Sequence, residues 1–133
     1  MKIGIIGPSY PYRGGIAAFN VRLAQEYVSQ GHEVTLYTFT LQYPGFLFPG
    51  TTQYSDDPAP EGLNIVRCIN SCNPFNWIRA GRCIRRDAPD MVVFAYWMSY
   101  FAPCFGTISR ILGRKVRKIG LIHNMISHEA NLM

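Results

Sequence analysis

Residues 2–30 read KIGIIGPSYPYRGGIAAFNVRLAQEYVSQ. Residues 2–7 are an apolar run with the length and composition of a buried strand, and a proline ends it. A loop then leads through Gly14 and Gly15 onto an amphipathic helix over residues 16–30. A glycine pair at a strand-to-helix corner lets a ligand approach the backbone at the positive end of the helix dipole. The corner therefore suits a phosphate group.

The rest of the chain alternates strands and helices. Further strands are predicted over residues 32–40, 63–68, 90–96 and 116–123, and further helices over 74–88 and about 101–112. Gly31 is expected to end the first helix, and Asn73 is expected to cap the second, with a proline at its first position. The strand over 90–96 is apolar almost throughout, which predicts burial on both faces. This β-α alternation predicts an α/β fold with an open, Rossmann-like parallel sheet covered by helices on both faces.

Composition bounds the class of protein. The chain has 133 residues, 48% of them hydrophobic and 16% charged, which is typical of one globular domain. Lys and Arg number 13 against 8 Asp and Glu, so the net charge is +5 and an anionic partner is favoured. Nucleotide phosphates, anionic lipid and nucleic acid all meet that description. No nucleic-acid-binding motif accompanies the charge, so nucleic acid is not expected.

Nothing in the sequence indicates a secreted or membrane-spanning protein. No apolar stretch approaches the roughly 20 residues of a membrane span, and the N-terminal run does not resemble a signal peptide. The four cysteines are expected to be free thiols. Cys68 and Cys72 lack the second ligand pair that a zinc site needs, so no metal site is predicted. The expected location is cytoplasmic.

A Rossmann-like fold also invites comparison with dinucleotide-binding oxidoreductases. That class needs a G-x-G-x-x-G turn and an acidic residue at the end of the second strand. Here Gly4 and Gly7 are followed by six residues before the next glycine, and the second strand ends in Thr-Phe-Thr. Both diagnostic features are missing, which disfavours this class.

Several segments in order resemble one family. IGP at residues 6–8 and YRGGIA at 12–17 resemble the amino-terminal signature of family 4 glycosyltransferases with the GT-B architecture. The segments QYP, FLFPG, NPFNW, PDMVV, FAP and HNMISHE, which follow between residues 42 and 129, resemble a bacterial branch of that family. Ser127 stands where proline is common, at a position to which we assign no role. The resemblance covers the whole chain.

The resemblance implies a fold, an activity and a domain arrangement. Such enzymes have two Rossmann-like domains, an acceptor-side domain followed by one that holds a nucleotide-diphosphate sugar. They retain anomeric configuration, need no metal and use no cofactor beyond the sugar donor. Residues 1–133 would then be the N-terminal domain, and we expect the C-terminal nucleotide-sugar domain to follow in a longer polypeptide. Because the acidic pair that grips the donor belongs to that second domain, the 133-residue chain alone is expected to be inactive.

The resemblance also implies roles for individual residues. Gly14 and Gly15 would approach the donor phosphates, and His123, after the fifth strand, would contact the donor sugar at the edge where open parallel sheets bind ligands. Arg13 lies beside the glycines and would add a charge to a phosphate, unless it is an exposed loop arginine. A histidine in the position of His123 is also often a core residue hydrogen-bonded to backbone.

Three further residues are candidates for the acceptor or sugar site. Trp97 would stack on an acceptor sugar, although a core role fits it equally well. The amide of Asn124 would reach a sugar hydroxyl or shape a turn. Glu129 would pair with His128 in acid–base chemistry, and a place in the first turn of a helix is the slightly favoured alternative.

Three surface features fit contact with an anionic membrane. Arginines crowd the predicted helix over 74–88, a second basic cluster lies at residues 110–118, and the segment 43–49 is aromatic. Basic and apolar residues together favour peripheral binding to anionic lipid, and lipid-linked acceptors are common among similar enzymes. For each patch taken singly, the slightly favoured alternative is a solvated helix face or, for the loop, packing on its own core. The competing function is a stand-alone nucleotide- or phospholipid-binding module without catalysis.

Overall fold

The computed structural model describes residues 1–9, 15–41, 63–70, 72–96 and 101–122. In this part of the chain, five parallel strands form one sheet in the order β3-β2-β1-β4-β5. The elements, in chain order, are β1 (Lys2–Ile6), α1 (Gly15–Ser29), β2 (Glu33–Leu41), β3 (Asn64–Asn70), α2 (Pro74–Arg86), β4 (Met91–Tyr96), α3 (Ala102–Leu112) and β5 (Arg117–Ile122). The predicted α/β class with a Rossmann-like parallel sheet is confirmed.

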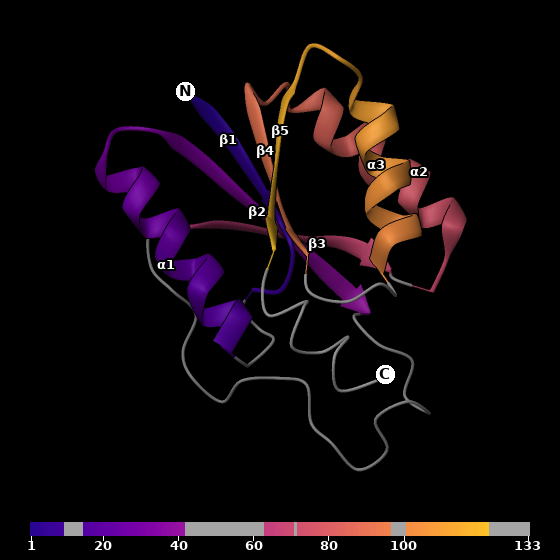
Figure 1. Cartoon of the computed structure of the whole chain (residues 1–133), viewed down its shortest axis with the longest axis horizontal. Helices are drawn as coiled ribbons and strands as arrows, with labels where there is room; N and C mark the ends of the chain where they lie inside the picture. Colours follow the sequence, from indigo (N-terminus) through magenta and orange to yellow (C-terminus); the bar gives the residue numbers. More distant parts are fainter. Residues whose placement is uncertain (10–14, 42–62, 71, 97–100, 123–133) are drawn as a thin grey trace.

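Helices cover both faces of the sheet, as the apolar strands require. Helix α1 lies on one face, and α2 and α3 lie side by side on the other (Figure 1). Ile3 and Ile5 of β1 pack in the core on the α1 side, whereas Ile6 packs in the core under α2 and α3. Strand β4 is buried from Met91 to Ala95, so the prediction that it is buried on both faces is correct.

Local signals set the ends of the helices. The side chain of Asn73 accepts hydrogen bonds from the backbone N–H groups of Phe75 and Asn76, and Pro74 takes the first helical position of α2. Helix α1 ends in a Schellman motif, in which the N–H of His32 donates to the carbonyl of Tyr27. Gly31 has a φ of +90° there, a conformation that favours glycine.

Helix α2 is shorter than predicted. It ends at Arg86, where the sequence predicted residue 88, because Ala88 takes a positive φ of 53° that a helix cannot contain. The other predicted boundaries agree with the structure to within one or two residues.

The parallel register brings the carboxyl ends of the strands to one edge of the sheet. Ile6 of β1 pairs with Tyr37 of β2 and with Phe94 of β4, and Tyr96 of β4 pairs with Ile122 of β5. From β1 the chain moves through β2 to β3 on one side, and β4 and β5 lie on the other. The strand order therefore reverses between β1 and β4, and ligands of open parallel sheets bind at such a switch point.

Candidate functional site

The predicted phosphate corner lies at the switch point. Gly15 is the first residue of the 15-residue helix α1, which follows β1 and therefore begins at the carboxyl edge of the sheet. The first turn of α1 contains no acidic residue that would offset the positive end of the helix dipole. The backbone of α1 is thus oriented as an anion site requires.

The exit from β1 needs glycine at position 7 for steric reasons. The N–H of Gly7 donates to the carbonyl oxygen of Tyr37 at 3.1 Å, which continues the pairing with β2. A Cβ atom at Gly7 would lie 2.8 Å from the Cβ atom of Ala95 on β4 and 3.2 Å from the amide nitrogen of Asn20 on α1. The absence of a side chain therefore lets β1, β4 and α1 meet closely at the switch point.

A buried asparagine fastens α1 to this turn. Asn20 is fully buried, and its Nδ2 atom donates to the carbonyl oxygen of Pro8 at 2.8 Å. Its Oδ1 atom, the hydroxyl of Ser9 and the hydroxyl of Thr38 have no hydrogen-bond partner among the described residues, although all three side chains are buried. Among the described residues, these three buried polar atoms therefore keep spare hydrogen-bonding capacity.

Asn20, Ser9 and Thr38 were not among the site residues predicted from the sequence. A signal for the first was available, because Ala17, Asn20 and Ala24 have the spacing of the inward face of a helix. An asparagine on that face needs a partner inside the protein.

Most of the predicted site residues lie outside the described part of the chain. Gly15 is described. The predicted residues outside the described part are Arg13, Gly14, Trp97, His123, Asn124, His128 and Glu129. The structure places the residues that come directly before them, since β4 ends at Tyr96 and β5 ends at Ile122, and these two residues pair. The roles assigned to the residues beyond these strand ends stay predictions.

A second group of polar residues lies at the same edge, where β3 leads into α2. Asn76 donates through Nδ2 to the carbonyl of Cys68 at 3.0 Å, and its Oδ1 atom accepts from the N–H of Asn70 at 2.6 Å. The indole N–H of Trp77 donates to the carbonyl of Asn70 at 2.9 Å. A hollow of about 200 Å³ opens here, lined by Asn70, Asn73, Phe75, Asn76 and Arg79. The asparagine side chains form hydrogen bonds within the protein. Phe75 and Arg79 are therefore the lining side chains that face the solvent.

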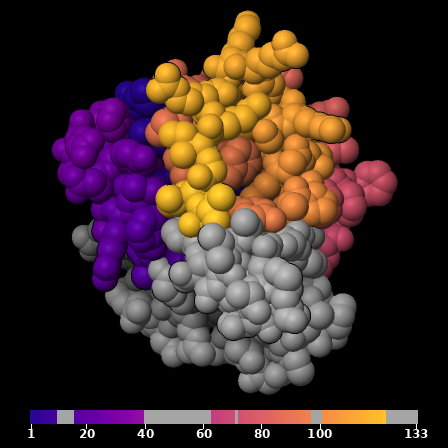
Figure 2. All heavy atoms as spheres, in the orientation of Figure 1, coloured from indigo at the N-terminus to yellow at the C-terminus, as the bar shows by residue number. Residues whose placement is uncertain are grey.

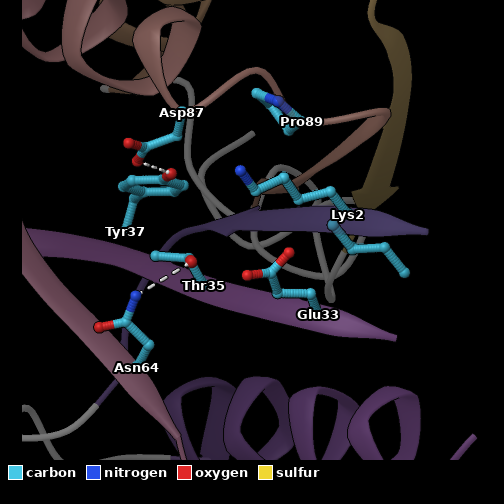
Figure 3. A pocket seen from close by; sticks show the side chains of 8 residues that line it. Lys2, Glu33, Thr35, Tyr37, Asn64, Asp87 and Pro89 are labelled. Atoms are coloured by element: carbon cyan, nitrogen blue, oxygen red, sulfur yellow. Dashed lines mark hydrogen bonds between the residues drawn. The ribbon is translucent and has the colours of Figure 1, made fainter. Parts of the chain in front are cut away.

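A second hollow lies at the opposite, amino edge of the sheet (Figure 3). It has a volume of about 160 Å³, and its polar lining residues largely bond to one another. The hydroxyl of Tyr37 donates to Asp87, and Asn64 donates to the hydroxyl of Thr35 at 3.2 Å. Burial, reinforced by the hydrogen bond and charge of Asp87, raises the pKa of Tyr37 well above its usual value. The phenol is therefore a neutral donor that joins β2 to the end of α2, which is a structural role.

The cysteines are not arranged as a reactive or metal-binding centre. All four thiols are free, and burial raises the pKa of Cys68 and of Cys104 to about 12. Across residues 1–9, 15–41, 63–70, 72–96 and 101–122, no group of three or more His, Cys, Asp and Glu side chains is placed to hold a metal ion.

None of the helices described combines the length and the apolar character of a membrane span.

Three solved glycosyltransferase structures share this fold. An α-glucosyltransferase in complex with UDP matches 90% of this chain with a TM-score of 0.59 and 13% identity. An α-glucosyltransferase with UDP and a 13-mer DNA containing a central A:G mismatch gives the same values, and one with UDP and DNA containing an HMU base has a TM-score of 0.53 and 14% identity. The chain spans 28–30% of the length of these proteins. At this level of identity the likeness shows the fold.

The family itself follows from the sequence. A comparison with curated proteins finds no match. The family model described as Glycosyltransferase Family 4 matches residues 13–132, which is nearly the whole chain. The resemblance inferred from the glycine corner and the later segments is thereby confirmed, and the chain belongs to glycosyltransferase family 4.

Proposed function

We propose that this chain is the acceptor-side domain of a retaining, metal-independent glycosyltransferase. Such an enzyme would move a sugar from a nucleotide-diphosphate sugar to a glycan or lipid-linked acceptor. The observation that carries the proposal is the start of α1 at Gly15, on the carboxyl edge of β1, in a chain whose match to the family spans residues 13–132.

The chemistry of glycosyl transfer explains why this corner matters. As the bond to the sugar breaks, negative charge develops on the diphosphate leaving group. Backbone N–H groups at the N-terminus of a helix stabilise such charge without a metal ion. Helix α1 supplies an uncompensated N-terminus, and Arg13 would add a charge-assisted hydrogen bond.

Asn20 has a supporting role in this proposal. Its hydrogen bond to Pro8 connects the first half of α1 to the turn that leaves β1. The distance between the switch point and the helix N-terminus is thereby restrained. A catalytic site gains from such restraint because its charges are then oriented before the reaction begins.

The remaining site residues are proposed from their positions in the sequence. His123 would contact the donor sugar, and Gly14 would share the phosphate contact with Gly15. Trp97, Asn124 and Glu129 would contribute to the acceptor or sugar site. Trp97 and His123 directly follow the paired ends of β4 and β5, which supports placing both at the switch-point edge.

A nucleotide diphosphate is the favoured donor carrier. The structurally similar α-glucosyltransferases were solved with UDP bound. The net charge of +5 is also consistent with an anionic substrate. The sugar and the base would be selected mainly by a second domain.

Two observations test the proposal. The gene's reading frame beyond Met133 should encode a second α/β domain with a pair of glutamates about two helical turns apart. The complete polypeptide should then transfer sugar from a nucleotide sugar in the presence of EDTA, with NMR showing the donor's anomeric configuration in the product. A stop codon directly after Met133 would overturn the enzyme proposal in favour of a stand-alone nucleotide- or phospholipid-binding module. An inverted product or a metal requirement would overturn the corresponding part of the mechanism.

A further inference from the structure

The exposed face of α2 carries an arrangement that the sheet and core do not explain. Phe75 is 83% exposed and Ile78 is 40% exposed, although both are large and apolar. The same helix exposes four arginines. They are Arg79, Arg82, Arg85 and Arg86.

These side chains form one continuous stripe. At about 100° per residue, positions 75, 78, 79, 82, 85 and 86 fall within an arc of about 120° on the helix. The inward arc holds Ala80, Gly81 and Ile84, which are buried against the sheet and α3. Figure 2 shows the rose-coloured atoms of α2 projecting along the right-hand margin of the molecule. We call these six outward residues the α2 stripe.

The α2 stripe and its neighbour α3 account for the whole net charge of the protein. Helices α2 and α3 contain five arginines and no acidic residue. The chain has 13 Lys and Arg and 8 Asp and Glu, so the eight basic residues outside these helices are matched in number by the eight acidic ones. In number, the net charge of +5 therefore equals the charge that these two helices carry.

The N-terminus of α2 is not available as an anion site of its own. Asn73 already accepts hydrogen bonds from the N–H groups of Phe75 and Asn76 at 3.0 and 3.4 Å. A ligand would therefore meet the arginine side chains, with Arg79 lining the hollow beside Phe75. Arg85 donates weakly to the carbonyl of Ile111 at 3.5 Å, whereas Arg79, Arg82 and Arg86 are the other exposed arginines of the stripe.

We propose that the α2 stripe binds the surface of an anionic phospholipid membrane. Phe75 and Ile78 would enter the interfacial layer at one end of the helix, and the three outward arginines would contact lipid phosphates along it. An apolar end joined to a basic face is the pattern of helices that lie in a membrane interface. A nucleic acid would use the arginines but would gain little from burying Ile78. The α2 stripe begins at the carboxyl edge of the sheet, so a membrane bound there would border the proposed acceptor side.

Vesicle binding tests the proposal without any sugar transfer, so its result is separate from that of the proposed function. The 133-residue protein should sediment with vesicles of phosphatidylcholine and phosphatidylglycerol and much less with phosphatidylcholine alone. Replacing Arg79, Arg82 and Arg86 with Gln should lower the partition coefficient roughly a hundredfold, or about fivefold for each charge removed. Phe75→Ser should lower it roughly tenfold.

A control variant replaces an arginine and an apolar residue on α1, which covers the opposite face of the sheet. Arg22→Gln combined with Val28→Ser alters an exposed arginine and a 41% exposed valine on α1, and vesicle binding should not change. Circular dichroism should show that every variant keeps the helical content and thermal midpoint of the parent, since the altered side chains are exposed. Equal binding to neutral and anionic vesicles would overturn the proposal. So would unchanged binding after the arginine replacements, or arginine-dependent binding of nucleic acid without binding of vesicles.

Discussion

Replacing Asn20 tests whether α1 is held to the β1 exit as described. Its Nδ2 atom lies 2.8 Å from the carbonyl oxygen of Pro8, and both residues are buried. Asn20→Ala would leave that carbonyl unpaired but would also remove the unpartnered Oδ1 atom. We therefore expect a loss of about 1–2 kcal/mol in the free energy of unfolding. This corresponds to a fall of roughly 1 M in the urea midpoint.

Asn20→Asp is the sharper variant because it keeps the shape and removes the donor. A carboxylate beside the Pro8 carbonyl would be buried without a partner, so the loss at neutral pH should reach about 3 kcal/mol or more. Protonation at low pH restores a donor, so the gap between the Asp and Ala variants should narrow as the pH falls.

Urea denaturation followed by circular dichroism measures both effects. Gln30→Ala is the control, since it removes an exposed side-chain hydrogen bond to Glu26 and should change stability by less than about 0.5 kcal/mol. If Asn20→Asp were as stable as the parent at neutral pH, the amide would not donate to Pro8 and the described attachment would be wrong.

Three further predictions concern the core. Gly7→Ala should cost about 1–3 kcal/mol in urea denaturation, because its Cβ atom would approach a β4 side chain to 2.8 Å; a neutral result would contradict the close packing at the switch point. Because the pKa of Tyr37 is raised in the folded protein, its hydrogen bond stabilises the fold fully below pH about 10, and this stabilisation is lost as the pH rises above that value. Tyr37→Phe should therefore lower the free energy of unfolding by about 1 kcal/mol at neutral pH and reduce its fall at alkaline pH. An unchanged fall at alkaline pH would refute this. Exposed Cys72 should react with iodoacetamide at pH about 8. Cys104 is buried and Cys68 is half-buried, and burial raises the pKa of both thiols to about 12, so Cys104 should react only on unfolding and Cys68 much more slowly than Cys72. Peptide mass mapping that finds Cys104 labelled at the rate of Cys72 would contradict its burial.

The sequence predicted those parts of the fold that depend on local signals. The Asn73–Pro74 start of α2 and the Gly31 end of α1 are both as predicted, because caps and turns rest on residues a few positions apart. The end of α2 was predicted two residues late. Ala88 directly precedes Pro89, and the residue before a proline is disfavoured in the helical conformation, so the helix ends before it.

The site was predictable only as far as chain order implies it. A strand followed by a glycine corner and a helix is enough to predict an anion site near Gly15. The contact of Gly7 with Ala95 and the bond from Asn20 to Pro8 join segments distant in sequence. They depend on the strand order and register, which no local pattern encodes. The outward position of Phe75 was open to prediction, because helical spacing puts it on the same arc as Arg79, Arg82 and Arg86.

The most direct test of the central claim is a transfer assay on the complete polypeptide. Radiolabelled nucleotide sugars would be supplied in EDTA, and the parent would be compared with His123→Ala and with the matched control His32→Ala at the amino edge of the sheet. The proposal predicts that the parent forms a glycosylated product and that His123→Ala slows its formation roughly a hundredfold or more while keeping the fold. His32→Ala should leave the rate near that of the parent. A polypeptide that binds nucleotides yet transfers no sugar, or whose transfer rate is the same with and without His123, would contradict the account.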